Sequence, residues 1–207
     1  MLVLLRHGEA VGNADGLLLG RIDSPLTARG SRQAAGLATF LAGGSIFSSV
    51  SRVIASPLTR ARSTADALGL GIPVEVDERW IEVDYGEFDG QKLSGVPAEV
   101  WRAWRADPGY RPNGGETLAE MGVRVRAACE ELFGSDGKGA RGDSDVVVVS
   151  HVSPIKAAVG WALGTDDSVA WRLWLATASV TVIGWGNGAP VLQRYNVTVP
   201  DDQAAGT

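Results

Sequence analysis

At 207 residues, 45% of them hydrophobic and 21% charged, the chain has enough apolar material for a sizeable core, and we expect residues 1–199 to form one domain. A formal net charge of -5 and a pI near 5.1 provide no basic field for a nucleic-acid backbone, so no nucleic-acid partner is expected. The single cysteine, Cys129, cannot form an internal disulfide, and no apolar segment approaches the roughly 18 residues of a membrane span. Because Met1–Leu5 is too short for a signal-peptide core, we expect a cytoplasmic protein without membrane contact. The tail at 200–207 is expected to be frayed.

The N-terminal part of the chain predicts strands and helices in alternation. The apolar run Leu2–Leu5 predicts a strand buried on both faces. Thr27 is predicted to cap a helix that Gly43-Gly44 ends. A second buried strand is predicted at Val50–Ala55, and Ser56-Pro57 after it places a capping hydroxyl before a proline, which favours a helix start.

The remainder of the chain continues the alternation. A helix is predicted at Thr117–Leu132, followed by a loop at Gly134–Ser144, and Ser153-Pro154 predicts another helix start. Four further strands are predicted, the last two as a hairpin: Pro73–Val76, Asp145–Val149, Ser179–Trp185 and Pro190–Arg194. This order predicts an α/β fold, a three-layer α/β/α sandwich with a mainly parallel central sheet.

The chain has two histidines, His7 and His151, and each follows a predicted buried strand. Either one alone is equally well explained as a structural histidine. If the two strands are neighbours in a parallel sheet, however, both imidazoles and Arg6 meet at the carboxyl edge, where such sheets bind ligands. Arg60 lies in the first turn of the predicted second helix, where the positive helix end favours an anion, although position alone leaves its role open. Together these residues predict a phosphate site.

Five ordered blocks, spanning roughly residues 2–195, resemble the histidine phosphatase superfamily, the phosphoglycerate mutase-like group. They are Arg6-His7-Gly8-Glu9 with Asn13 and Gly20–Thr27, Ala55–Ala61, Glu82–Gly90, Gly114–Thr117 and Val148–His151. The segment from His151 to Ile155 is similar to the branch that contains α-ribazole phosphatase-like phosphatases. Ala10 departs from the family pattern, because many relatives carry Ser or Thr there.

The resemblance implies a role for each matching residue and requires no metal or other cofactor. His7 would be the nucleophile that becomes a phosphohistidine, and Glu82 the acid that protonates the leaving oxygen. The other implied contacts to the phosphoryl group or substrate are Arg6, Arg60, His151, Asn13, Tyr85 and the Val152 backbone N–H.

Spacing alone does not identify the acid. Five other carboxylates share its segment and are interpreted as mostly solvated: Asp77, Glu78, Asp84, Glu87 and Asp89. Only the register of the family block with Tyr85-Gly86 selects Glu82.

The preferred hypothesis is a metal-independent phosphomonoesterase acting on a small phosphorylated metabolite. A phosphoglycerate mutase is the alternative, and a noncatalytic phosphate-binding regulatory protein is the third. The short segment between Gly90 and Gly114 favours hydrolysis, because a mutase must shield its phosphoenzyme from water. Six tryptophans are interpreted as core or subunit contacts, which leaves a homodimer open, and Trp80 could touch the substrate.

Overall fold

The computed structural model describes residues 1–43, 50–134 and 144–199, which form a six-stranded sheet in the order β3-β2-β4-β1-β5-β6. The strands are β1 (Leu2–Arg6), β2 (Val50–Ala55), β3 (Val74–Val76), β4 (Asp145–Ser150), β5 (Ser179–Gly186) and β6 (Ala189–Thr198). Strands β3, β2, β4 and β1 are parallel, whereas β5 and β6 are antiparallel to their neighbours. The mainly parallel sheet is therefore confirmed, and the predicted tail and most of the loop Gly134–Ser144 lie outside the described residues.

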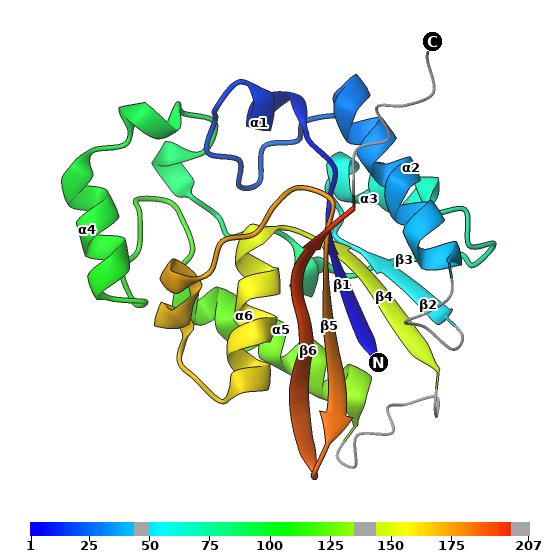
Figure 1. Ribbon diagram of the computed structural model, residues 1–207. Helices are drawn as coiled ribbons and strands as arrows, with labels where there is room; N and C mark the ends of the chain where they lie inside the picture. Colours follow the sequence, from blue (N-terminus) through cyan, green and yellow to red (C-terminus); the bar gives the residue numbers. More distant parts are fainter. Residues whose placement is uncertain (44–49, 135–143, 200–207) are drawn as a thin grey trace.

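Helices cover both faces of this sheet, as Figure 1 shows. Helices α2 (Ala28–Ala42) and α3 (Thr59–Ala67) lie on one face, and α5 (Leu118–Phe133) and α6 (Val152–Leu163) on the other. The short α1 (Val11–Ala14) lies beyond the carboxyl end of β1, and α4 (Ala98–Ala106) extends to one side. Four 3-10 segments complete the described helices: η1 (Glu78–Trp80), η2 (Gly86–Phe88), η3 (Leu93–Gly95) and η4 (Asp167–Arg172). The three-layer α/β/α fold is confirmed.

Strand β1 shows why its sequence is apolar throughout. Its side chains alternate between the two cores, with Leu2 and Leu4 packed in the core that contains α5 and α6. Val3 and Leu5 pack in the opposite core, with α2 and α3. A strand with helices on both faces needs apolar residues in both registers.

The parallel pairing of β1 with β4 brings the two histidine positions together. Arg6 is paired with Ser150, and the His7 N–H donates to the Ser150 carbonyl at 3.1 Å. His7 and His151 therefore follow neighbouring strands at the same edge of the sheet, which is the condition under which both imidazoles were expected to meet.

The predicted helix starts are right at two places and wrong at two others. Thr27 caps α2 by accepting from Gly30 N at 2.9 Å, and Thr117 caps α5 in a reciprocal pair with Glu120. Ser56, in contrast, does not cap α3, which begins at Thr59. Ser153 does not cap α6 either, because that helix begins at Val152 and His151 occupies the cap position.

The helix α3 is capped by a residue from a distant segment. Asp23 Oδ1 accepts from Thr59 N at 2.9 Å, which satisfies the first N–H of this helix. The Ser56 hydroxyl is committed to the His151 ring instead. A sequence pattern that predicts local capping does not detect a partner 36 residues away.

The tryptophans occupy different environments. Trp80 is fully buried and packs in the core that contains α5 and α6, so contact between Trp80 and the substrate stays a prediction. Trp161 and Trp185 pack on Phe133, as expected of core residues, with ring centroids at 5.4 and 5.7 Å. Trp174 is 72% exposed, which is not a core position.

Across the described residues, none of the helices has the length and apolar character to cross a membrane.

Candidate active site

His7 is held in one tautomer by its own loop. It is 3% exposed, and its Nδ1 lies 2.7 Å from the Gly8 carbonyl oxygen. Because a carbonyl can only accept, Nδ1 carries the proton and the neutral ring keeps a lone pair on Nε2. Burial lowers the pKa of His7 well below its ordinary value, and the charges of Arg6 and Arg60 lower it further. The neutral ring is therefore favoured, with Nε2 able to act as a nucleophile.

Arg6 presents an unused donor beside His7. Its Nη1 donates to the Leu175 carbonyl at 2.6 Å, whereas its buried Nε has no hydrogen-bond partner among the described residues. Burial lowers the pKa of Arg6 to about 10, so the guanidinium remains charged at neutral pH. A buried, charged donor without a partner favours an anionic ligand.

Arg60 is completely buried and held on three sides. Nη1 donates to the Ile22 carbonyl at 2.9 Å and Nη2 to the Gly20 carbonyl at 2.8 Å. Nε donates to His151 Nδ1 at 3.3 Å. Burial lowers the pKa of this guanidinium too, against the raising effect of Glu82 and other acids. The loop at 20–22 thus fixes the second cation of the site.

Asp89 organises that loop from the opposite side. Its carboxylate accepts from Gly20 N at 2.7 Å, Arg21 N at 2.7 Å and Ile22 N at 2.9 Å. The N–H groups of the loop therefore point to Asp89, while two of its carbonyls point to Arg60. Its interpretation as a solvated carboxylate is wrong. No sequence signal identified it, because its partners lie nearly 70 residues earlier in the chain.

His151 is oriented by two neighbours. Its Nδ1 accepts from Arg60, so the neutral ring carries its proton on Nε2, which lies 2.7 Å from the Ser56 hydroxyl oxygen. Its ring centroid is 5.0 Å from that of His7. Burial lowers the pKa of His151 well below its ordinary value, and its cationic neighbours contribute. Both imidazoles are therefore neutral in a pocket that holds two guanidinium groups.

Glu82 supplies a buried carboxyl group that interacts with both Arg6 and Arg60. It is 3% exposed, and its Oε1 accepts from Val83 N at 2.8 Å and from Ser153 N at 3.3 Å. Because the Ser153 N–H belongs to the first turn of α6, the side chain bridges the segment at 82–83 to the helix that follows His151.

A group of polar side chains that sequence analysis did not identify holds the backbone of Glu82. Its carbonyl accepts from Arg21 Nε at 2.9 Å and from Arg124 Nη2 at 3.3 Å. Glu116 contacts both guanidinium groups, with ion pairs of 3.2 Å to Arg21 and 2.8 Å to Arg124. The main chain carrying Glu82 is therefore fixed from two other segments.

The remaining residues predicted to contact the phosphoryl group or the substrate are Asn13, Val152 and Tyr85. Asn13 Oδ1 accepts from Ala10 N at 3.0 Å, which leaves the amide NH2 as the end that can donate to a phosphate. Val152 is the first residue of α6. The Tyr85 hydroxyl lies 3.3 Å from Ser153 Oγ, and burial raises the pKa of Tyr85.

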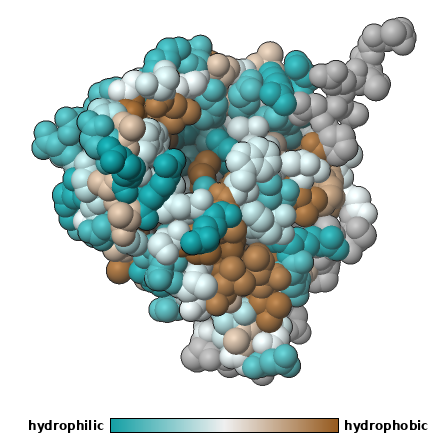
Figure 2. All heavy atoms as spheres, turned by 60° about the vertical axis from the view of Figure 1, so that its left-hand side comes forward, coloured by the Kyte–Doolittle hydropathy of each residue, from teal (hydrophilic) through white to brown (hydrophobic). Residues whose placement is uncertain are grey.

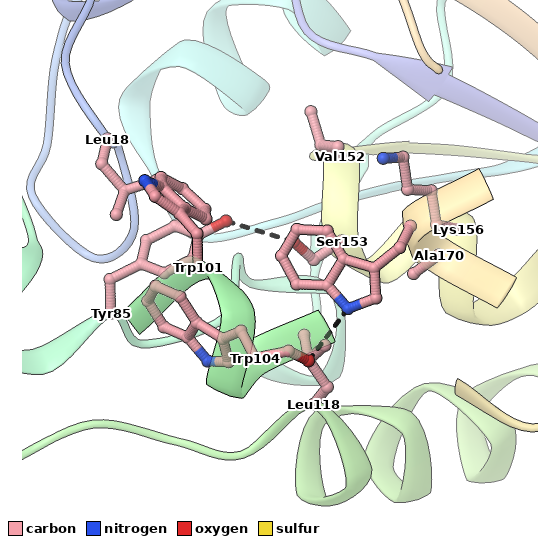
Figure 3. A pocket seen from close by; sticks show the side chains of 10 residues that line it. Leu18, Tyr85, Trp101, Trp104, Leu118, Val152, Ser153, Lys156 and Ala170 are labelled. Carbon is pink, nitrogen blue, oxygen red and sulfur yellow. Dashed lines mark hydrogen bonds between the residues drawn. The ribbon is translucent and has the colours of Figure 1, made fainter. Parts of the chain in front are cut away.

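A cavity of about 150 Å³ lies next to this arrangement, between α4 and α6. Figure 3 shows its walls, and Figure 2 shows a hollow in the surface on the α4 side of the molecule. Its lining residues are Leu18, Tyr85, Trp101, Trp104, Leu118, Val152, Ser153, Lys156, Ala170 and Trp171.

Within the described residues, no group of three or more His, Cys, Asp or Glu side chains could hold a metal ion.

The paired histidines, the two buried guanidinium groups and the buried glutamate agree with a comparison to known proteins. The family model of the histidine phosphatase superfamily, branch 1, matches residues 2–198. The chain belongs to this superfamily. The predicted family is therefore confirmed.

Similar proteins include several named as phosphatases. Phosphoserine phosphatase 1 of Hydrogenobacter thermophilus is 32% identical over 203 residues, which cover 95% of this chain and 92% of that protein. A solved mycobacterial glucosyl-3-phosphoglycerate phosphatase has a TM-score of 0.81 at 29% identity, over 95% of this chain and 98% of that one. A solved Escherichia coli protein that is named as an α-ribazole-5'-P phosphatase has a TM-score of 0.80 at 28% identity, over 94% of this chain and 95% of that one. A bifunctional protein of Mycobacterium tuberculosis is 33% identical, and the chain spans only 54% of its length.

The substitution Asp89→Asn tests the loop at 20–22. An amide offers one acceptor oxygen and no charge to three N–H donors, so we expect the free energy of unfolding to fall by about 2 kcal/mol. Inorganic phosphate should also bind less tightly, because Arg60 loses its fixed carbonyl partners. Urea unfolding with and without phosphate measures both effects. Glu87→Gln, at an exposed carboxylate two residues away, is the control, and equal midpoints in the two variants would contradict the role of Asp89.

The buried neutral imidazoles predict a pH dependence of stability. Their pKa values are lowered in the folded state, while in the unfolded chain they are about 6.5. Below pH 6.5 the unfolded chain binds protons that the folded chain does not. The free energy of unfolding should therefore fall as the pH falls from about 6.5 toward the folded-state pKa, by up to ~1.4 kcal/mol per pH unit for each histidine.

The variant His151→Asn isolates the contribution of His151 to the pH dependence of stability. The carboxylates titrate in both proteins, so their contribution cancels when the variant is compared with the wild type. Urea unfolding at pH 7.5, 6.5 and 5.5 should show a smaller loss of stability on acidification in the variant. The same slope in both proteins would show that His151 is not a neutral buried group.

Proposed function

We propose that the protein is a metal-independent phosphomonoesterase that hydrolyses a small phosphorylated metabolite through a phosphohistidine on His7. The observation that carries this proposal is the His7 ring itself. Its Nδ1 is bound to the Gly8 carbonyl, so its Nε2 lone pair is available beside the unpartnered Arg6 Nε. A nucleophile next to buried cations suits a phosphate monoester, whose anionic oxygens need electrostatic stabilisation.

In the first step, His7 Nε2 attacks the phosphorus atom and forms an N–P bond. The P–O bond to the alcohol breaks, and Glu82 gives its proton to the leaving oxygen. Arg6 and Arg60 balance the charge on the equatorial oxygens, with Asn13 and the Val152 N–H as further donors. The His151 ring lies beside the same site, with its centroid 5.0 Å from that of His7.

In the second step, a water molecule attacks the same phosphorus atom. Glu82, now a carboxylate, takes a proton from this water as the N–P bond breaks. The products are the alcohol and inorganic phosphate, and His7 returns to its neutral form. Two displacements at one phosphorus atom need positioned charges and a proton carrier.

Two alternatives are less well supported. A mutase would return the phosphoryl group to another hydroxyl, but three of the four relatives described above are named as phosphatases. A noncatalytic phosphate-binding protein would have no need of the tautomer that leaves His7 Nε2 unprotonated. Hydrolysis is therefore the reaction that this site supports best.

The first test is phosphate release by the wild type and by His7→Ala. We expect the wild type to release inorganic phosphate from p-nitrophenyl phosphate in the presence of EDTA, and His7→Ala to lose at least about 10³-fold in kcat, because its nucleophile is gone. Quenching the wild type during turnover should trap an acid-labile phosphoenzyme that His7→Ala lacks. A folded wild type that releases no phosphate from any monoester of a metabolite panel would refute the proposal, as would net conversion of 3-phosphoglycerate to 2-phosphoglycerate without free phosphate.

Glu82→Gln separates the two roles of the acid. Nitrophenolate leaves without help, whereas an alkoxide needs a proton. We expect the variant to lose 10²- to 10⁴-fold in kcat/KM for an alkyl phosphate and far less for p-nitrophenyl phosphate. With the nitrophenyl ester, the phosphoenzyme should accumulate and give a burst of nitrophenol, because its hydrolysis still needs a base. Equal losses on both esters without a burst would exclude Glu82 as the proton carrier.

A further inference from the structure

The cavity between α4 and α6 adjoins the acid of the proposed reaction. Ser153 belongs to both places, since its N–H contacts Glu82 at 3.3 Å and its side chain lines the cavity. Tyr85 lines it as well and contacts Ser153 through its hydroxyl (Figure 3). If Glu82 protonates the leaving oxygen, the alcohol that carries this oxygen extends past Glu82 toward the cavity.

Aromatic rings form one wall of this cavity. Trp104 is 2% exposed and fixed, with Tyr85 edge-on to it at 5.6 Å between ring centroids. Trp101 lies 5.5 Å from Trp104 and 6.3 Å from Trp171, again between centroids, and both outer rings are partly exposed. The Trp171 Nε1–H donates to the Trp104 carbonyl at 3.1 Å. Arg105 lies over the Trp171 ring, with its Cζ 5.7 Å from the ring centroid. Trp101 and the remaining surface of Trp171 form a preformed apolar surface suited to a flat or apolar ring.

Lys156 is the charged side chain on the opposite wall. It follows Ser153 by one helical turn, so both lie on the same face of α6. Among the described residues its ammonium group makes no hydrogen bond or salt bridge, although the side chain is half-buried. Burial lowers the pKa of Lys156, while the charge of Glu82 raises it. An ammonium that is partly removed from water and has no protein partner is suited to an anionic group on the ligand.

We infer that the cavity binds the alcohol part of the substrate and selects an alcohol that carries both a ring and a carboxylate. The ring would lie against Trp101 and Trp171, and the carboxylate would contact Lys156. The inference rests on the proposed phosphatase activity, because it places the leaving group on the Glu82 side of the phosphorus atom. It adds a specificity that the phosphate-binding residues do not provide.

A matched pair of esters tests the role of Lys156. 3-Carboxyphenyl phosphate and 3-carbamoylphenyl phosphate have nearly the same shape, and only the first carries the additional negative charge. We expect the wild type to favour the carboxylate about tenfold in kcat/KM, which is the size of one charge-assisted hydrogen bond. Lys156→Met should reduce this ratio to about one. Lys92→Met, at an exposed lysine outside the cavity, should leave the ratio as it is.

The outcomes separate this inference from the proposed function. A wild-type ratio near one would overturn the role of Lys156 while leaving the phosphatase intact. An equal loss on both esters in Lys156→Met would overturn it too, because the lysine would then act through Glu82 and not on the substrate. If neither ester is hydrolysed by the wild type, the proposed function itself fails.

A second pair of esters tests the aromatic wall. Cyclohexylmethyl phosphate and ethyl phosphate have leaving groups of similar basicity, so their kcat/KM ratio reports binding of the ring. Trp101→Ala should lower this ratio about fivefold or more, since a ring loses apolar contact area. A thermal melt shows whether the variant is folded. An unchanged ratio in a folded Trp101→Ala would remove the ring from the inferred substrate class.

Discussion

Burial of the Arg60 guanidinium is the constraint on which the rest of the site depends. Removing this charge from water costs several kcal/mol unless its donors are satisfied, and three acceptors satisfy three of its five N–H groups. Two of these acceptors are main-chain carbonyls of the loop at 20–22, which must therefore turn inward. The N–H groups of the same loop then need an acceptor, and Asp89 supplies it. The same segment continues to Asp23, which caps the helix that carries Arg60.

Burial, and after it the charge of the two cations, also determines the protonation of the two histidines. A charged imidazole next to Arg6 and Arg60 would add a third positive charge to a pocket largely closed to water, so both rings are neutral. For His7 this is the form that can attack, and the Gly8 carbonyl selects the nitrogen that does so. The positive charge that adds to burial in keeping His7 neutral is therefore the same charge that attracts a phosphate group.

Sequence analysis predicted the parts of the site that depend on the sheet. The apolar runs before His7 and His151 predicted strands of a mainly parallel sheet, because a strand buried on both faces has a characteristic pattern, but they left open whether the two strands are neighbours. Glu82 was identified only through the family resemblance, since its segment is rich in carboxylates. The roles of Asp89 and Ser56 were misjudged because their partners come from distant segments, and no local period encodes such contacts.

The two halves of the site are built from different parts of the fold, which bears on how specificity can change. His7, Arg60 and His151 follow three parallel strands, and their positions depend on the register of the central sheet. The aromatic wall of the cavity, with Trp101, Trp104 and Trp171, comes from α4 and η4, connections that lie outside the sheet. Substitutions in that wall can alter which alcohol fits without disturbing the strand ends. Lys156 is the exception, because it lies on α6, one turn beyond the residue whose N–H holds Glu82. A substitution that removes the charge of Lys156 therefore affects both the substrate and Glu82. Specificity for an anionic alcohol thus cannot change without an effect on the acid, whereas substitutions of the tryptophans change specificity alone.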